Sequence, residues 1–390
     1  MAEPKPFTLH VPDDAIADLR ERLGRTRFPD QPPGEPWATG TDVDWLRDVV
    51  AYWRDGFDWR EAEVRLNALP NFTLPLGGIG LHYLHVPGRG PDPMPLLLSH
   101  GWPGSVFEFM DIIPRLADPA RFGGDPADSF TIVAPSLPGY GLSFAPGQRR
   151  FGVGDMADLF AELMSALGYD RFLAQGGDWG ASVTARLAHA HPERLVGIHM
   201  NLLPIGRDPA ALADPSPEEA VYLRELKAWL KEQAGYSQIQ GTRPQTLAFG
   251  LTDSPAGLAA WIGEKFRAWS DHDGDVFAAI GRDAMLADIA LYWFTGAIGS
   301  SFWPYYARIM GGERAVPEGA TVAVPTGYAA FPREILRPPR SIAARTFTDI
   351  RRWTTMERGG HFAALEQPDA LAREIAAFAR PLRGGEAWTR

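Results

Sequence analysis

The 390-residue chain contains no cysteine. Disulfide bridges, zinc sites built from thiolates and a thiol nucleophile are therefore excluded. Clusters of positive charge are also missing, because the net charge is −10 and no lysine- or arginine-rich run offers a stripe for phosphate groups. We therefore expect no nucleic-acid partner.

Long apolar runs are absent as well. The first residues, Met1 to Pro6, lead into no apolar stretch of signal-peptide length, and no uncharged apolar run reaches membrane-spanning length. We expect no membrane partner and a cytoplasmic location. With 45% hydrophobic and 22% charged residues, the chain has the composition of a globular protein with a sizeable core.

Short apolar runs alternate with helical patterns through much of the chain. The runs that favour strands lie at residues 72–76, 81–86, 95–100, 130–134, 195–201, 321–325 and 352–356. The helical patterns lie at residues 106–116, 156–167, 179–189 and 368–382. This alternation predicts a mostly parallel sheet that is covered by helices on both faces.

Two further segments are helical. The first is residues 1 to about 75 and contains three helical patterns. Asp13 and Asp14 can cap the first helix, Thr41 or Asp42 can begin the second, and the third starts near Trp59. The second segment, residues 205–310, is rich in tryptophan and tyrosine and suits a lid over a pocket. We therefore divide the chain into a helical extension (1–75), a first core part (76–204), a lid (205–310) and a second core part (311–390).

One apolar run ends in a turn that is typical of a nucleophile. Residues 173–182 read LAQGGDWGAS, so that a strand breaks at Gly176 and a helical pattern resumes after Asp178. Small residues two positions before and after a central residue allow a sharp turn that presents one side chain. The commoner nucleophile is serine, but no G-x-S-x-G occurs in this sequence. Asp178 is therefore the candidate nucleophile.

The nucleophile needs a base and an acid that orients the base. After this type of turn the acid is expected first in the chain and the histidine base after it. His361 fits the base because it follows a strand candidate and two glycines, whereas His199 lies in an apolar run and His272 in a polar turn. Glu334, after the run at 321–325, is the candidate acid. Its position alone would suit a solvated glutamate at a helix start nearly as well.

Two backbone amides are candidates for holding the negative oxygen that develops in the reaction. The first belongs to Trp179, directly after the nucleophile, and the second to Trp102 in the loop HGWPGS at residues 100–105. We predict that His100, Pro103, Trp179 and Phe362 border the substrate pocket.

The nucleophile limits the reaction. A carboxylate displaces a group from a saturated carbon and leaves an ester that water can open, so the fitting substrates are epoxides and haloalkanes. An epoxide oxygen gains charge while it is still attached to the substrate, and a protonated tyrosine can supply its proton. The predicted lid contains Tyr236 and the neighbouring pair Tyr305 and Tyr306.

These motifs together resemble the microsomal-type epoxide hydrolases of the α/β-hydrolase superfamily. The resemblance rests on HGWPGS at 100–105, GGDWG at 176–180, GY at 235–236, DSPAGL at 253–258, VPTG at 324–327 and RGGHF at 358–362. It implies an α/β-hydrolase fold with an inserted helical lid and an N-terminal extension that wraps around the lid and core.

The resemblance also implies roles for individual residues. Asp178 would be the nucleophile, His361 the base that activates water, and Glu334 its partner. Tyr236 and Tyr305 would hold and protonate the epoxide oxygen. Counting from the paired serines at 300–301 favours Tyr305, with Tyr306 as the alternative.

We therefore expect an enzyme that converts a small hydrophobic epoxide and water to a vicinal diol, without a cofactor or a metal ion. The alternatives are a haloalkane or haloacid dehalogenase with the same nucleophile, and a binding protein that uses the scaffold without catalysis. The sequence is also compatible with a homo-oligomer.

Overall fold

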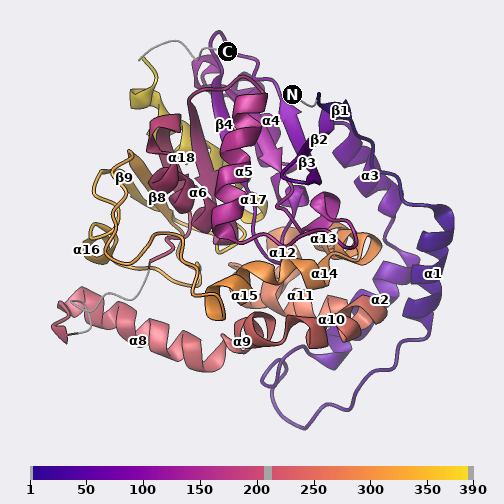
Figure 1. The fold of residues 1–390 in the computed structure, drawn as a ribbon. Coiled ribbons are helices and arrows are strands. Elements are labelled where there is room, and N and C mark those ends of the chain that lie inside the picture. The colour runs from indigo at the N-terminus through magenta and orange to yellow at the C-terminus, as the bar shows by residue number, and fades with distance from the viewer. Residues whose placement is uncertain (1–2, 206–212, 385–390) are drawn as a thin grey trace.

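The computed structural model describes residues 3–205 and 213–384. Its centre is a nine-stranded sheet with the strand order β1-β2-β3-β5-β4-β6-β7-β8-β9 (Figure 1). The strands are β1 (Lys5–Pro6), β2 (Asn71–Leu76), β3 (Ile79–Val86), β4 (Met94–Ser99), β5 (Phe130–Pro135), β6 (Phe172–Gly176), β7 (Leu195–Met200), β8 (Thr326–Ala330) and β9 (Ile350–Thr355). The six strands β5, β4, β6, β7, β8 and β9 run parallel to one another, whereas β1, β2 and β3 add an antiparallel edge. The predicted, mostly parallel sheet is thus confirmed.

Helices cover both faces of this sheet. Every residue of β4 and β7 is buried, as strands between two helical layers require. Helices α5 (Val153–Ala166) and α6 (Asp178–Ala190) pack together on one face, and α4 (Ile112–Ala117) and α18 (Pro368–Ala379) pack together on the other (Figure 1). The remaining core helices are short: α16 (Arg340–Ala343), α17 (Ala363–Glu366) and six 3-10 helices, η1 (Val106–Phe109), η2 (Pro119–Phe122), η3 (Pro126–Asp128), η4 (Gly141–Ser143), η5 (Pro192–Arg194) and η6 (Arg380–Leu382).

A group of helices lies between β7 and β8 in the chain and gathers at one end of the core (Figure 1). Its members are α8 (Pro217–Glu232), α9 (Gly235–Thr242), α10 (Pro244–Asp253), α11 (Pro255–Trp269), α12 (Val276–Ile280), α13 (Arg282–Thr295), α14 (Ile298–Ser301) and α15 (Trp303–Ile309). They occupy the segment for which a lid was predicted. Residues 206–212 of that segment lie outside the described residues.

The N-terminal segment connects the sheet with these helices. It holds α1 (Asp13–Gly24), α2 (Val43–Asp55) and α3 (Trp59–Asn67), and it runs along one side of the molecule in Figure 1. Asp42 caps α2, because its side chain accepts hydrogen bonds from the amides of Asp44 and Trp45. Helix α2 packs against α11, and Thr41 Oγ1 donates a 2.8 Å hydrogen bond to the carbonyl oxygen of Ala260.

Three local predictions were wrong. The run at 321–325 is extended but forms only one isolated bridge, from Val322 to Phe347, and the strand begins afterwards, at Thr326. Pro325 has no N–H for a ladder, which places it before the strand. The helix expected at 106–116 is split into η1 and α4, since Pro114 cannot donate to a carbonyl of the preceding turn. The third wrong prediction is the cap of the first helix. Asp13 and Asp14 lie inside the first turn of α1, and the residue before the helix is Pro12, which offers no side-chain cap.

Candidate active site

The predicted turn at Asp178 joins β6 to α6. Asp178 has φ 47°, a left-handed conformation that is rare for a residue with a side chain. A Cβ atom on Gly176 would overlap the backbone of Gly180, and one on Gly180 would overlap the carbonyl oxygen of Ser99. The two glycines therefore let the turn close tightly and hold the Asp178 carboxylate at the end of the strand.

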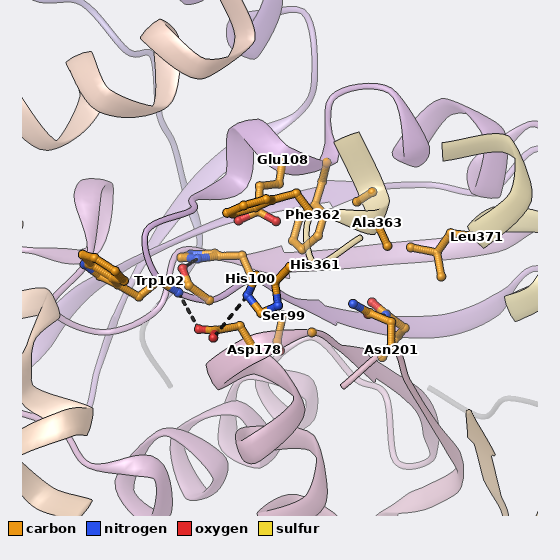
Figure 2. Close-up of a pocket in the computed structure, with 15 residues that line it drawn as sticks. Ser99, His100, Trp102, Glu108, Asp178, Asn201, His361, Phe362, Ala363 and Leu371 are labelled. Atoms are coloured by element: carbon orange, nitrogen blue, oxygen red, sulfur yellow. Dashed lines mark hydrogen bonds and ion pairs between the residues drawn. The ribbon is translucent and has the colours of Figure 1, made fainter. Parts of the chain in front are cut away.

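The loop that follows β4 reaches this carboxylate. The amide of Trp102 donates a 2.7 Å hydrogen bond to Oδ1 of Asp178 (Figure 2). A Cβ atom on Gly101 would overlap the Asp178 side chain, so the close approach requires glycine there. The amide of Trp179 lies in the first turn of α6, where an N–H group has no carbonyl of its own helix to bond.

His361 and Glu334 complete the cluster from two neighbouring loops. Nε2 of His361 lies 3.4 Å from Oδ2 of Asp178 (Figure 2), and Nδ1 of His361 lies 2.6 Å from Oε1 of Glu334. Glu334 follows β8 and His361 follows β9, and a bridge between Arg333 and Gly360 joins the two loops. The structure thus brings together the three side chains that the sequence singled out.

The charge of His361 depends on these carboxylates. Burial by itself lowers the pKa of His361, but the negative charge of Glu334 and the contact with Asp178 outweigh it and raise the pKa well above its ordinary value. The two neighbouring acidic side chains therefore favour the protonated form of the imidazole.

The tyrosines Tyr236 and Tyr305 face Asp178 from α9 and α15. The ring of Tyr236 stacks on Trp102 with 5.4 Å between centroids, and the ring of Tyr305 lies 4.8 Å from Trp179. Burial raises the pKa of both phenols above their ordinary value, so both hydroxyl groups are protonated at neutral pH. The hydroxyl group of Tyr305 has no hydrogen-bond partner in the described part of the chain.

The structure also separates Tyr305 from its neighbour. Tyr306 stacks on Trp303 with 4.8 Å between ring centroids, and its side chain does not line the cavity described next. Tyr305 does line it. Of the two adjacent tyrosines, Tyr305 is therefore the one that lies beside Asp178.

A cavity of about 430 Å³ lies between the core and the lid helices. Asp178 and Trp179 line it from the core, and Trp229, Tyr236 and Tyr305 line it from the other side. Most of the remaining lining is apolar, from Leu202, Leu203, Leu226, Leu230, Val316 and Ile335 among others. The cavity is large enough for a small hydrophobic molecule beside the carboxylate.

A second, much smaller pocket of about 20 Å³ adjoins the first at Asp178 (Figure 2). Among the described residues, Asp178 is the one lining residue that the two spaces share. His361, His100 and Phe362 line the small pocket. Of the residues predicted at the substrate pocket, Trp179 thus borders the large cavity, His100 and Phe362 border the small one, and Pro103 is buried beside neither.

His100 also holds the loop after β4 in place. Its Nε2 accepts a 3.1 Å hydrogen bond from the amide of Leu137, and its Nδ1 donates one of 3.0 Å to the carbonyl oxygen of Gly101. Burial lowers the pKa of His100 to about 4, so the ring is neutral and can fill both roles. It thereby fixes the loop that carries Trp102.

Comparison with known proteins gives the same fold and family. The family model described as “Epoxide hydrolase N terminus” matches residues 4–109, and the one described as “alpha/beta hydrolase fold” matches residues 94–239. A relative from Stigmatella aurantiaca is 43% identical over 378 residues, 97% of this chain and 85% of its own. Epoxide hydrolase 1 of Oryctolagus cuniculus is 36% identical over 96% of this chain and 88% of its own. The chain belongs to the epoxide hydrolase family.

Solved structures of this family superpose on nearly the whole chain. Juvenile hormone epoxide hydrolase from the silkworm Bombyx mori has a TM-score of 0.87 at 31% identity, and covers 98% of this chain and 95% of its own. Aspergillus niger epoxide hydrolase has a TM-score of 0.83 at 30% identity, with 97% of each chain covered. The α/β-hydrolase fold that the resemblance implied is confirmed. None of the helices in the described part of this family member combines the length and apolar character needed to cross a bilayer.

The sequence analysis did not single out two residues that line the two spaces beside Asp178. Arg308 lines the large cavity, where its guanidinium lies 4.9 Å from the ring centroid of Trp179 and donates to Ser237 Oγ. Glu108 lines the small pocket. It stands three residues after Ser105, and this S-x-x-E spacing is typical of a helix cap. Its orientation toward the pocket could therefore not be read from the sequence.

Proposed function

We propose that this chain is an epoxide hydrolase that converts an epoxide to a vicinal diol through an ester on Asp178. The observation that carries the proposal is the different surroundings of the two oxygens of Asp178. Oδ1 accepts the amide hydrogen of Trp102, while Oδ2 faces His361. One oxygen is thus held by a backbone donor, and the other is available to attack a substrate carbon.

Ring opening takes place in the large cavity. Oδ2 of Asp178 attacks one epoxide carbon, and the bond from that carbon to the ring oxygen breaks. The oxygen takes a proton from Tyr236 or Tyr305, whose buried phenols are protonated and line the same cavity. A halide would leave without a proton, so two protonated tyrosines beside the nucleophile favour an epoxide over a haloalkane.

Ester hydrolysis follows. Esterification removes the negative charge of Asp178, so the pKa of His361 falls. The imidazole then gives up its proton, which restores the tyrosine that protonated the epoxide oxygen, and the free Nε2 can accept a proton from water. The hydroxide that forms attacks Cγ of Asp178, and negative charge gathers on Oδ1, which the amides of Trp102 and Trp179 stabilise. The tetrahedral intermediate then expels the diol oxygen, which takes the proton from His361. The carboxylic acid left on Asp178 returns its proton to the imidazole, which restores the starting carboxylate. Glu334 keeps the imidazole oriented throughout.

The relatives and the cavity support this substrate class. The rabbit relative is named epoxide hydrolase 1, and the silkworm structure is that of a juvenile hormone epoxide hydrolase. The lining of the large cavity is mainly apolar, which favours a hydrophobic epoxide. A cytoplasmic location remains a prediction from the lack of a signal-peptide stretch or a membrane-spanning run in the sequence.

The division of the chain follows from the same proposal. The helices at 213–310 act as a lid that carries both tyrosines, and residues 1–75 act as an extension that braces the lid through the contact between α2 and α11. The extension also contributes β1 and most of β2 to the sheet, so it is joined to the core as well as to the lid.

A panel of styrene-type, aliphatic and polycyclic epoxides tests the proposed function, with diol formation as the readout and D178A as the control. We expect diol from the intact chain and none above background from D178A. Halide release from haloalkanes, measured in parallel, should be absent. Halide release without diol formation would assign the chain to the dehalogenases instead.

A further inference from the structure

The small pocket beside Asp178 has the size and polarity of a water site. Its volume of about 20 Å³ exceeds the roughly 10–15 Å³ that one water needs. Polar side chains of His361, Asn201, Gln175 and Glu108 line it together with Asp178. Apolar side chains, among them Phe362 and Leu371, complete its lining. The large cavity has about 430 Å³, so Asp178 lies between a space with room for an organic substrate and a space with room for water only.

Glu108 is the acidic side chain in this pocket that the reaction described above does not use. It belongs to η1, and its carboxyl group lies where a Cβ atom on Gly104 would be. In Figure 2, Glu108 enters the pocket from one edge and Asp178 from the other. The Glu108 carboxyl group makes no hydrogen bond with any of the described residues. It is therefore free to bind a water molecule in the pocket.

The surroundings favour the neutral form of this carboxyl group. Burial raises the pKa of Glu108 well above its ordinary value, and the charges of Asp288 and Asp178 add to that rise, whereas His361 opposes it. Asp288, from α13, is itself buried and receives a hydrogen bond from Ser105. A neutral group here avoids placing another negative charge beside the oxygen of Asp178 that becomes negative during hydrolysis.

We propose that Glu108 holds the hydrolytic water together with His361. This inference rests on the proposed function. A water molecule has two hydrogens, and each needs an acceptor if a lone pair is to point at Cγ of Asp178. His361 Nε2 accepts one hydrogen and removes it as a proton in the reaction. The carbonyl oxygen of the Glu108 carboxyl group accepts the other, which stays on the attacking oxygen.

The role predicts which step a change at Glu108 affects. Ring opening occurs in the large cavity and needs no water, so it should not depend on Glu108. Ester hydrolysis needs an oriented water, and loss of one of its two acceptors should slow this step about ten- to a hundredfold. E108M removes the acceptor at similar side-chain length. E108Q keeps a carbonyl oxygen and should recover most of the lost rate.

Pre-steady-state kinetics of E108M, E108Q and the intact chain on one epoxide separate the two steps. We expect the ester to accumulate in E108M, seen as a protein mass increased by that of the substrate, with an unchanged rate of ring opening. E193M, at an exposed glutamate in η5, is the matched control. Ester hydrolysis in E108M at the rate of the intact chain would overturn the inference, and so would an equal loss in both steps or in E108Q.

A second variant keeps the test decisive if E108M does not fold. G104A retains Glu108, but the added Cβ atom would displace the Glu108 carboxyl group from its place. We expect G104A also to accumulate the ester, and unchanged hydrolysis in folded G104A would overturn the inference. Absence of diol from the intact chain would contradict the proposed function instead, so the two failures are distinguishable.

Discussion

The imidazole of His361 donates a 2.6 Å hydrogen bond from Nδ1 to Oε1 of Glu334, and both side chains are almost fully buried, with 2% and 0% of their surfaces exposed. Because the acceptor is a carboxylate, Nδ1 carries the hydrogen and Nε2 is directed at Asp178. The protonation of Nε2 therefore depends on whether Asp178 is a carboxylate or an ester.

H361Q should separate the two chemical steps. Without a base, water attacks the ester slowly, while ring opening by Asp178 still proceeds. We expect turnover to fall roughly 10²- to 10⁴-fold, with one equivalent of substrate bound covalently. Intact-protein mass spectrometry after mixing with an epoxide measures the adduct, and H272Q, in the polar turn, is the matched control. Loss of turnover without an adduct would remove His361 from the role of base.

The pKa of His361 should fall when its partner is neutralised. In the intact protein, burial lowers this pKa, but Glu334 and Asp178 raise it above the ordinary value. E334Q removes one of these charges, so we expect a lower pKa in a titration of the histidine ring signals by NMR. The signal of His361 is assigned by its absence in H361Q. A pKa in E334Q equal to that of the intact protein would contradict the ion pair.

The same shift predicts how stability depends on pH. The pKa of His361 is higher in the folded protein than in the unfolded chain. The charged pair therefore stabilises the fold fully below the ordinary pKa of about 6.5, and this stabilisation is lost as the pH rises through the higher pKa of the folded protein. Urea unfolding over a pH series measures this as a falling free energy of unfolding. H361Q should show a smaller decrease over the same range, and parallel curves would argue against the pair.

Removal of either lid hydroxyl should slow ring opening. Y236F and Y305F each leave one phenol in the cavity, so we expect each to reduce the rate of ester formation roughly ten- to a hundredfold and the double variant to reduce it further. Y306F is the matched control, because Tyr306 stacks on Trp303 and does not line the cavity. A loss in Y306F as large as that in Y305F would reassign the second tyrosine.

The close packing of the turn at Asp178 predicts the effect of replacing its glycines. A Cβ atom at Gly180 would overlap the backbone of Ser99, so G180A should destabilise the fold by about 1–3 kcal/mol and displace Asp178. Gly250 is an exposed helical glycine with open space at its Cβ, so G250A should instead add about 0.5–1 kcal/mol. Thermal melts and the rate of ester formation measure both. Tolerance of G180A without loss of either would contradict this account of the turn.

The order of motifs along the chain was sufficient to predict the positions of the main site residues. In a parallel sheet the carboxyl ends of the strands meet at one edge, so side chains that follow successive strands come together there. Asp178, Glu334 and His361 follow β6, β8 and β9, and the loop after β4 supplies Trp102. Glu334 lies beside His361 although the strand before it begins five residues later than predicted, because the residue still follows that strand.

The rest depends on packing between distant segments. Tyr305 and Tyr306 are neighbours in sequence, and only the docking of α15 on the core decides which of them lies beside Trp179. The small pocket that Glu108 enters is completed by residues far away in the sequence, among them Asn201 and His361. No local pattern of residues encodes either contact.

A single turnover in water labelled with heavy oxygen tests the central claim most directly. In the ester mechanism, the oxygen added to the substrate comes from Oδ2 of Asp178, and the oxygen of water remains in the carboxylate. We therefore expect an unlabelled diol and label in the peptide that contains Asp178. Label in the diol of the first turnover, with none in that peptide, would show direct attack by water and contradict the ester on Asp178.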